Sequence, residues 1–506
     1  MNEICTRDAN NIVIVATGSI SPTGENPAAS HTAALQHRTG LRELTPDDIP
    51  NFDLLAKVKG LTTADERAAF FRNAWGDKCG VGGLIPKEYF PDPAGAGYPK
   101  GYFKAGERLV GVSVLQTHLA FEQTRRRLQT LFCDEGRIRA DLAKRTMIDV
   151  ATGAGSSVEM MESALIEFLM AGNDKALGES YGKSGWLLGM LGNMSAGQLA
   201  AFAGIEGAQS SSNSACASSG LSMFNGFNAI QAGAADIAFV GGSENPVGPV
   251  NTYLSFDHMM RRKGGALSRN WRERRGAEHA LTAYGADRDG FVPGNAAGVI
   301  VMMRRRVADL LQLEPLVRVL GVAANTCQSR KFGKSLADGT LTGQAALLEE
   351  LLGRSGIDVA AFRGRLVHYL HATGTHAGAI NELYAAAKVF GGVARDKRYV
   401  GAGTKEGIGH TLAPAQIMNI IAAIEALREG TVAGFPSTEQ VDPAFQHADP
   451  NILERERVGV DSMSLKAVAD GIPCRTNVAI DASNVLVIST AAGFGGTNAA
   501  AAMVRE

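Results

Sequence analysis

One cysteine and two histidines stand in loops of small residues and together have the equipment for nucleophilic chemistry. Cys216 lies in Ser-Ala-Cys-Ala-Ser-Ser-Gly, and His371 and His410 follow in His-Ala-Thr-Gly-Thr and Lys-Glu-Gly-Ile-Gly-His. A thiol with two imidazoles suits attack on a thioester and the formation of a carbon–carbon bond beside it. Whether they can act together depends on the helices and strands that position them.

Cys216 follows a small, polar run over 208–215 and precedes a helix predicted over 217–232. The macrodipole and free N–H groups of a helix N-terminus favour a thiolate at this position. Small neighbours leave room for a substrate to reach the sulfur. Taken alone, the residue fits a buried structural cysteine equally well.

His371 ends a strand-like run over 366–370, and His410 lies five residues after Lys405, ahead of a helix. Either one alone is also explained as a satisfied loop histidine. His368 and His376 are close to His371 in the sequence, and three neighbouring histidines could in principle bind a metal ion. Alternation along a strand would put His368 and His371 on opposite faces, and no HExxH or cysteine pair accompanies them, so no metal is predicted.

Composition narrows the class of protein. The net charge of −1 over 506 residues argues against nucleic-acid binding. Six scattered cysteines without a CxxC pair fit reduced thiols in the cytoplasm, and the polar N-terminus does not resemble a secretory signal. No apolar run approaches the roughly 18 residues of a membrane span.

Buried-type strands alternate with helical patterns and predict an α/β fold with a mostly parallel sheet in two similar halves. Two segments, 60–145 and the basic 257–286, are expected to be peripheral. The predicted strands are 11–18, 146–153, 235–242, 298–303, 316–323, 366–374, 399–403 and 484–490. The predicted helices are 156–170, 217–232, 343–353, 378–389 and 414–428.

In order and spacing, these segments resemble the β-ketoacyl synthases, the condensing enzymes of fatty-acid and polyketide assembly. Further carriers of the resemblance are Ala-Asp-Arg-Asp-Gly-Phe-Val (286–292), Glu382 after His371, and Gly-Phe-Gly-Gly-Thr-Asn (493–498). The resemblance implies a thiolase-like fold of five layers, αβαβα, with halves at 10–310 and 314–504 and an insertion at about 60–145. It also implies a homodimer.

The resemblance further implies roles for single residues. Cys216 would carry the acyl group, and His371 and His410 would hold the malonyl thioester carbonyl. Lys405 and Glu382 would support the histidines as an ion pair. The N–H groups of Cys216 and Phe494 would form the oxyanion hole, with the Phe494 ring as a gate to the acyl pocket.

The expected partners are acyl carrier protein and the malonyl and acyl thioesters that it presents. The chain would need no cofactor of its own, because phosphopantetheine arrives on the carrier protein. The basic stretch would receive this acidic partner, with Arg269 as the single candidate for docking.

Several positions depart from the family pattern. Ala372 replaces a glycine, Ala379 an aspartate, Asn295 part of Gly-Glu-Gly-Ala-Gly, and Gln416 a glycine. Ala492 stands where the family has a phenylalanine, which should open space beside the acyl pocket, unless another side chain fills it.

Two alternatives stay open beside the condensing enzyme. One is an acyltransferase that uses the same acyl-cysteine without decarboxylation, and the other is a chain-length partner subunit. The presence of Cys216 disfavours the second. Thiolases share the fold but carry a second cysteine in a Cys-x-Gly loop, and Cys474 is not in such a loop.

Overall fold

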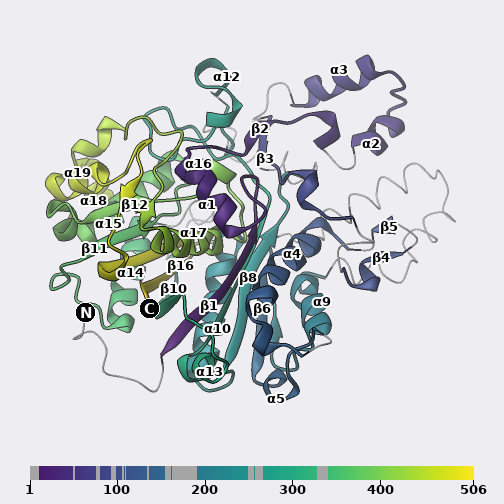
Figure 1. Ribbon diagram of the computed structural model, residues 1–506. Coiled ribbons are helices and arrows are strands. Elements are labelled where there is room, and N and C mark those ends of the chain that lie inside the picture. Colours follow the sequence, from purple (N-terminus) through teal and green to yellow (C-terminus); the bar gives the residue numbers. More distant parts are fainter. Residues whose placement is uncertain are drawn as a thin grey trace.

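The structure is a computed structural model (Figure 1). It describes residues 11–48, 52–75, 80–92, 98–104, 107–108, 110–133, 136–153, 161, 191–248, 256, 266–269, 271–327 and 340–506. The helix predicted over 156–170 and most of the basic stretch before Ala266 lie outside the described residues.

Ten strands join into one sheet in the order β12-β11-β15-β16-β10-β1-β9-β8-β6-β7. The first half of the chain supplies β1 (Ile12–Ile20), β6 (Thr146–Ala151), β7 (Gln209–Ser210), β8 (Ile237–Glu244) and β9 (Ala296–Arg304). The second half supplies β10 (Val317–Thr326), β11 (Arg365–Tyr369), β12 (Tyr399–Ala402), β15 (Val485–Ala492) and β16 (Thr497–Arg505).

The two halves of this sheet have the same topology. From the outer edge to the middle of the sheet, the second half has the order β12-β11-β15-β16-β10 and the first half the order β7-β6-β8-β9-β1. If the five strands of each half are numbered along the chain, both orders are 3-2-4-5-1. The halves meet where β1 pairs antiparallel with β10, with Ile12 opposite Val319. This repeat fits the two similar halves expected from the sequence.

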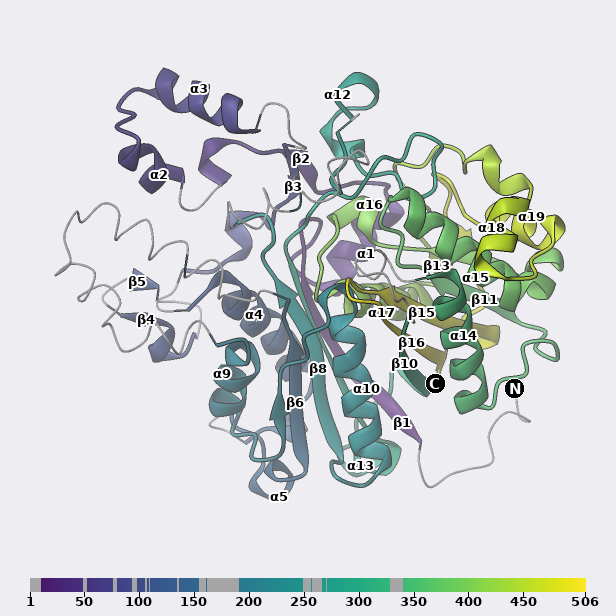
Figure 2. The same ribbon diagram turned by 180° about the vertical axis from the view of Figure 1, so that it is seen from behind.

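Helices form the other layers. Helices α10 (Ser218–Gln231) and α17 (Ala415–Glu429) share a buried cluster with strands of both halves. Helices α4 (Val112–Arg127) and α9 (Met194–Ala203) cover the outer face of the first half, and α14 (Leu341–Ser355) and α15 (His376–Arg395) that of the second (Figures 1 and 2). The predicted five-layer α/β architecture is therefore confirmed.

The remaining elements are short or peripheral. The other helices are α1 (Pro27–Leu35), α2 (Phe52–Val58), α3 (Ala64–Trp75), α5 (Ala140–Ala143), α12 (Trp271–Arg274), α13 (Arg305–Leu310), α16 (Lys405–Ile408), α18 (Pro450–Glu456) and α19 (Ser462–Asp470). The other strands are β2 (Leu41–Glu43), β3 (Val81–Gly83), β4 (Phe103–Lys104), β5 (Glu107–Arg108), β13 (Thr431–Val432) and β14 (Val478–Ala479). No helix among the described residues is long and apolar enough to cross a membrane.

Two expectations are wrong. The sheet is mixed rather than mostly parallel, because β1, β8, β9, β10, β15 and β16 pair antiparallel along the middle of the sheet. Helices cover both faces of the sheet, so its strands are apolar on both sides whether they pair parallel or antiparallel. The continuous apolar runs in the sequence therefore could not show the direction of pairing. The segment 60–145 is peripheral only in part: α3 stands apart in Figure 1, whereas α4 packs against β1 and β9 and is mostly buried.

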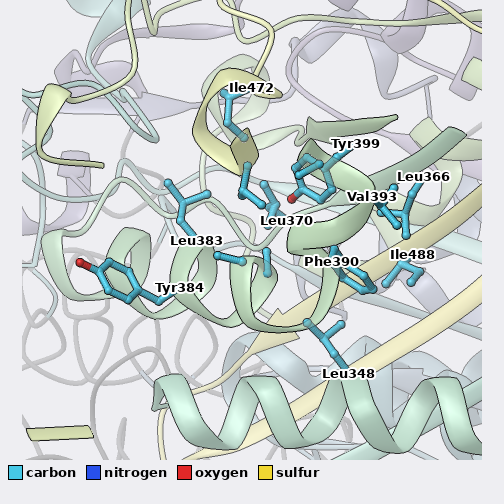
Figure 3. Packing of buried hydrophobic residues seen from close by; sticks show 14 of the residues in the cluster. Leu348, Leu366, Leu370, Leu383, Tyr384, Phe390, Val393, Tyr399, Ile472 and Ile488 are labelled. Atoms are coloured by element: carbon cyan, nitrogen blue, oxygen red, sulfur yellow. The ribbon is translucent and has the colours of Figure 1, made fainter. Parts of the chain in front are cut away.

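The largest buried cluster lies under α15, between α14, α19 and the strands of the second half. Figure 3 shows Phe390 of α15 near Leu348 of α14 and Ile488 of β15, with Leu383 further along α15 in the same cluster. Because α15 also carries Glu382, this packing fixes the helix that supports His371.

Replacement of Leu383 by alanine should therefore destabilise the protein by about 2–5 kcal/mol, the usual range for a buried leucine. Urea unfolding followed by circular dichroism measures the change. Leu310→Ala is the matched control, because Leu310 is 81% exposed and its loss should change the free energy by less than about 0.5 kcal/mol. Equal effects of the two variants would contradict the described packing.

Candidate active site

Cys216 and the two histidines come from different halves of the chain. Cys216 lies in a single 3₁₀ turn, Ala215–Ala217, directly before α10 of the first half. His371 lies just beyond the end of β11, and His410 follows α16 after Gly409. All three side chains are buried, and residues of both halves meet in this site.

The three side chains are within reach of one another. His410 Nε2 lies 3.0 Å from Cys216 Sγ, a hydrogen-bond distance. The rings of His371 and His410 are perpendicular, with centroids 5.3 Å apart. In the described part of the chain, this is the one group of Cys, His, Asp and Glu with potential metal-ligand atoms all within 4.8 Å of one another. The same spacing suits a thiol with two imidazoles acting on a bound carbonyl.

The backbone of His371 is held from two sides. The Glu382 carboxylate accepts hydrogen bonds from the N–H groups of His371 and, at 2.8 Å, of Ala372. Lys405 Nζ donates to the carbonyl oxygen of His371 and lies 3.4 Å from its Nδ1. Tyr284 donates its hydroxyl proton to Glu382 at 3.0 Å. Glu382 and Lys405 thus fix the position of His371 through its main chain.

Burial controls protonation in the site. It lowers the pKa of both His371 and His410 well below the usual 6.5, and the charge of Lys405 lowers them further. Both rings are therefore neutral at pH 7. Burial raises the pKa of Glu382 to about 7, while its hydrogen-bond donors and Lys405 act in the opposite direction. A neutral ring donates from one nitrogen and accepts at the other.

Each of the three residues has a strained neighbour in the left-handed region of backbone space. Ala215 precedes Cys216 with φ 49°, Ala372 follows His371 with φ 51°, and Leu412 is two residues past His410 with φ 56°. Such conformations cost about 1–2 kcal/mol for residues other than glycine. At Ala372 the departure from the family glycine falls on a position with positive φ.

The loop after β15 lies directly against the cysteine turn. A Cβ built on Gly493 would be 2.4 Å from the Ser214 carbonyl oxygen, so no side chain fits at this position. The next residue, Phe494, is half-buried, and its N–H donates no hydrogen bond within the described part of the chain. The main chain of Phe494 therefore lies next to the cysteine turn.

A series of aromatic contacts connects Phe494 with His410. Phe494 stacks on Phe256 with ring centroids 6.4 Å apart, and Phe256 packs edge-on against Phe291 at 5.4 Å. Phe291 in turn packs edge-on against His410 at 5.1 Å. Sequence reasoning assigned no role to Phe291 or Tyr284, although Phe291 lies in one of the motifs that carried the resemblance.

A small cavity adjoins His371 on the side of Ala492. Its interior open to the centres of water-sized molecules is about 10 Å³, room for about one water. His368 and His371 both line it, so their expected placement on opposite faces is wrong. Strand β11 ends at Tyr369, and strand alternation does not continue to His371. His368 itself lies within hydrogen-bond distance of Tyr399 and Thr490.

The other departures are structural in character. Ala379 is buried in α15, and Asn295 accepts a hydrogen bond from the Val247 N–H at 3.2 Å. Gln416 donates to the Ser489 carbonyl at 2.9 Å, and its oxygen occupies the space beside Gly220. Of these three side chains, none supplies a group to the cluster of Cys216, His371 and His410.

The docking candidate is less exposed than expected. Arg269 is half-buried, and its main-chain N–H donates to Asp289 at 2.7 Å. Arg275 forms an ion pair with Asp287. Arg261, Arg262 and Lys263 lie outside the described residues.

Known proteins share both the fold and the order of these segments. Residues 9–308 match the N-terminal domain of β-ketoacyl synthases, and residues 318–439 match the C-terminal domain. One chain from the structure of a type II polyketide synthase acyl-carrier protein in complex with its ketosynthase superimposes with a TM-score of 0.72, at 17% identity over 98% of this chain and 100% of that chain. A β-ketoacyl synthase from Burkholderia phymatum gives 0.70, at 19% identity over 98% and 100%.

Curated relatives agree. The chloroplast 3-oxoacyl-[acyl-carrier-protein] synthase II of Arabidopsis thaliana is 29% identical over 60% of this chain and 49% of its own. The 3-oxoacyl-[acyl-carrier-protein] synthase 1 of Escherichia coli K12 is 28% identical over 59% and 62%. The match spans about half the length of the chloroplast relative.

The fold and the junction of two similar halves define a thiolase-like protein with a cysteine and two histidines at its centre. Within that class, the chain belongs to the β-ketoacyl synthase family, as its sequence resemblance indicated.

The neutral, buried histidines predict how stability depends on pH. Their pKa values are lower in the folded than in the unfolded protein, so below about pH 6.5 the unfolded chain binds more protons and stability falls. Each deeply shifted ring should contribute about 1.4 kcal/mol to the loss between pH 7.5 and 5.5. Urea unfolding of His371→Gln should show a loss smaller by this amount.

His447→Gln is the control, because His447 is exposed. If His371→Gln and the unsubstituted protein lost equal stability over this pH range, burial of a neutral ring at His371 would be ruled out.

Proposed function

We propose that this chain catalyses a decarboxylative Claisen condensation, in which an acyl group on Cys216 is extended by a malonyl thioester. The observation that carries the proposal is the contact of 3.0 Å between His410 Nε2 and Cys216 Sγ, with the His371 ring perpendicular at 5.3 Å. The nucleophilic sulfur and two neutral imidazole rings are then close enough to act on the same bound thioester.

In the first step, the sulfur of Cys216 attacks the carbonyl of an acyl thioester. The carrier thiol leaves, and the acyl group stays on Cys216. The N–H groups of Cys216 and Phe494 stabilise the tetrahedral oxyanion. The close packing of Gly493 on the cysteine turn supports this pairing, because it holds the Phe494 main chain next to that turn.

In the second step, the malonyl thioester takes the place of the departed carrier. Its carbonyl oxygen accepts hydrogen bonds from His371 and His410, the bond to the carboxylate breaks, and CO₂ leaves its electron pair as an enolate. The enolate carbon attacks the acyl-cysteine, the carbon–sulfur bond breaks, and Cys216 is restored. Release of CO₂ drives the reaction without a nucleotide.

Glu382 and Lys405 act as positioning residues in this mechanism. Glu382 holds the N–H of His371, and Lys405 holds its carbonyl and keeps the nearby rings neutral by its charge. A neutral ring stabilises an enolate by hydrogen bonding and does not readily transfer a proton to it.

The substrates reach the site on acyl carrier protein, so the chain needs no cofactor of its own and phosphopantetheine comes with the carrier. We place Arg269 at the edge of the docking surface. We also propose a homodimer, and a cytoplasmic location in keeping with the free cysteines among the described residues. The named ketosynthase complex with its carrier protein supports the choice of partner.

Intact mass spectrometry tests the condensation. After incubation with an acylated carrier protein, the chain should gain one acyl group, and addition of malonyl-carrier protein should yield a β-keto product two carbons longer. Cys216→Ala should abolish the adduct. His371→Ala and His410→Ala should form the adduct but lower elongation by about 10²–10³-fold, as expected when a donor to the developing oxyanion is lost.

Cys133→Ala is the control, because Cys133 is an exposed free cysteine outside the group of Cys216, His371 and His410, and its loss should leave both steps intact. A stable adduct without elongation would replace the proposal by a non-decarboxylating acyltransferase. Absence of an adduct from chains of several lengths would favour a partner subunit.

We further propose that Ala492 leaves room beside the acyl group for one methyl branch of the chain. The cavity that it lines has room for about one water, so a phenyl ring at this position would displace its neighbours. Ala492→Phe should lower kcat/KM for a branched acyl-carrier protein more than for a linear one, with Ala492→Val intermediate. An unchanged ratio in competition assays would refute this role.

A further inference from the structure

A second cavity lies between α1, the end of β1, α17 and the turn α16. Thr404, Gly407 and Ile408 line it, whereas Lys405 and Glu406 of the same turn do not. It therefore lies against the part of α16 that does not face the cysteine site. No residue of the group Cys216, His371 and His410 lines this cavity.

Two buried polar atoms of the cavity lining have no partner within the described part of the chain. They are the Ser19 hydroxyl oxygen and His31 Nε2, in side chains that are 0% and 5% exposed. A buried polar atom without a hydrogen bond costs about 1–3 kcal/mol. Two of them at one cavity indicate an occupant with a polar group.

The chemistry of His31 and Ser19 defines that group. Burial lowers the pKa of His31, so its ring is neutral at pH 7. Nε2 of a neutral ring either donates or accepts, according to the tautomer, and a serine hydroxyl can do both. A hydroxyl group on the occupant can likewise donate and accept, so it can pair with His31 Nε2 in either tautomer and with Ser19.

The size and the walls define the rest of the occupant. The interior open to the centres of water-sized molecules is about 60 Å³, several times the 10–15 Å³ that one water needs. Pro27, Met418 and Ile421 give it apolar walls. Arg38 lines both this cavity and an adjoining open groove, which gives a route of entry.

We infer that this cavity binds a small, neutral organic molecule that carries a hydroxyl group. The hydroxyl forms a hydrogen bond with His31 Nε2 and meets Ser19, and the carbon body lies against Pro27, Met418 and Ile421. This site is separate from the proposed condensation and does not depend on it.

Isothermal titration calorimetry with phenol tests the inference, with toluene as the ligand that has the same ring but no donor. Phenol should bind at one site per chain, and toluene at least about ten-fold more weakly, since a ten-fold change corresponds to one hydrogen bond of about 1.4 kcal/mol. His31→Phe should weaken the binding of phenol by a similar factor and leave the affinity for toluene unchanged. Ser19→Ala serves as a second variant if His31→Phe does not fold.

Ala34→Met should fill the cavity and abolish binding of both ligands, because Ala34 lines it. Ala28→Met places the same side chain on an exposed position of the same helix and should bind phenol as the unsubstituted protein does. The inference is overturned if phenol does not bind, which would leave a cavity for water only. It is also overturned if toluene binds equally well, or if Ala34→Met binds phenol unchanged.

Discussion

The carboxylate of Glu382 accepts hydrogen bonds from the N–H groups of His371 and Ala372 and from the Tyr284 hydroxyl, in a region closed to water. A buried charge is tolerated only when its oxygens are hydrogen-bonded, so the loop after β11 must keep one shape. Lys405 fixes the same loop from its carbonyl side. The position of His371, and with it the geometry around Cys216, depends on these two buried side chains more than on the imidazole's own contacts.

The duplicated sheet explains where this loop lies. Each half has the same strand order, and Cys216 follows β7 whereas His410 follows β12, the corresponding edge strands of the two halves. His371 follows β11, which lies next to β12. Cys216 enters from the first half and His371 and His410 from the second. The left-handed residues Ala215 and Ala372 next to two of them store strain that the packed layers around them can hold. Rigid layers and tight loops thus give a water-poor site in which neutral histidines persist.

Much of the fold followed from the chain's apolar patterns. The predicted helix over 217–232 corresponds to α10, and the eight predicted strands correspond to β1, β6, β8, β9, β10, β11, β12 and β15. The pattern missed β16 (Thr497–Arg505), because four consecutive alanines in it, 499–502, favour helix by local propensity. They form a strand because pairing with β10 and β15 and cover on both faces outweigh that preference. The prediction of a mostly parallel sheet was also wrong, since apolar runs carry no information on the direction in which strands pair.

The sequence by itself determined which chemical groups the site has: one thiol, two imidazoles, a lysine and a glutamate, in loops whose small residues and spacing mark them. The tertiary structure alone decided the contact between Cys216 and His410, which are 194 positions apart, the support of Glu382 by Tyr284, and the aromatic contact of Phe291 with His410. It alone placed Ser19 and His31 around one cavity. The local sequence gives the residue types and the preferred backbone conformation of each segment. Contacts between segments that are far apart in the chain form only when the helices and sheets pack together.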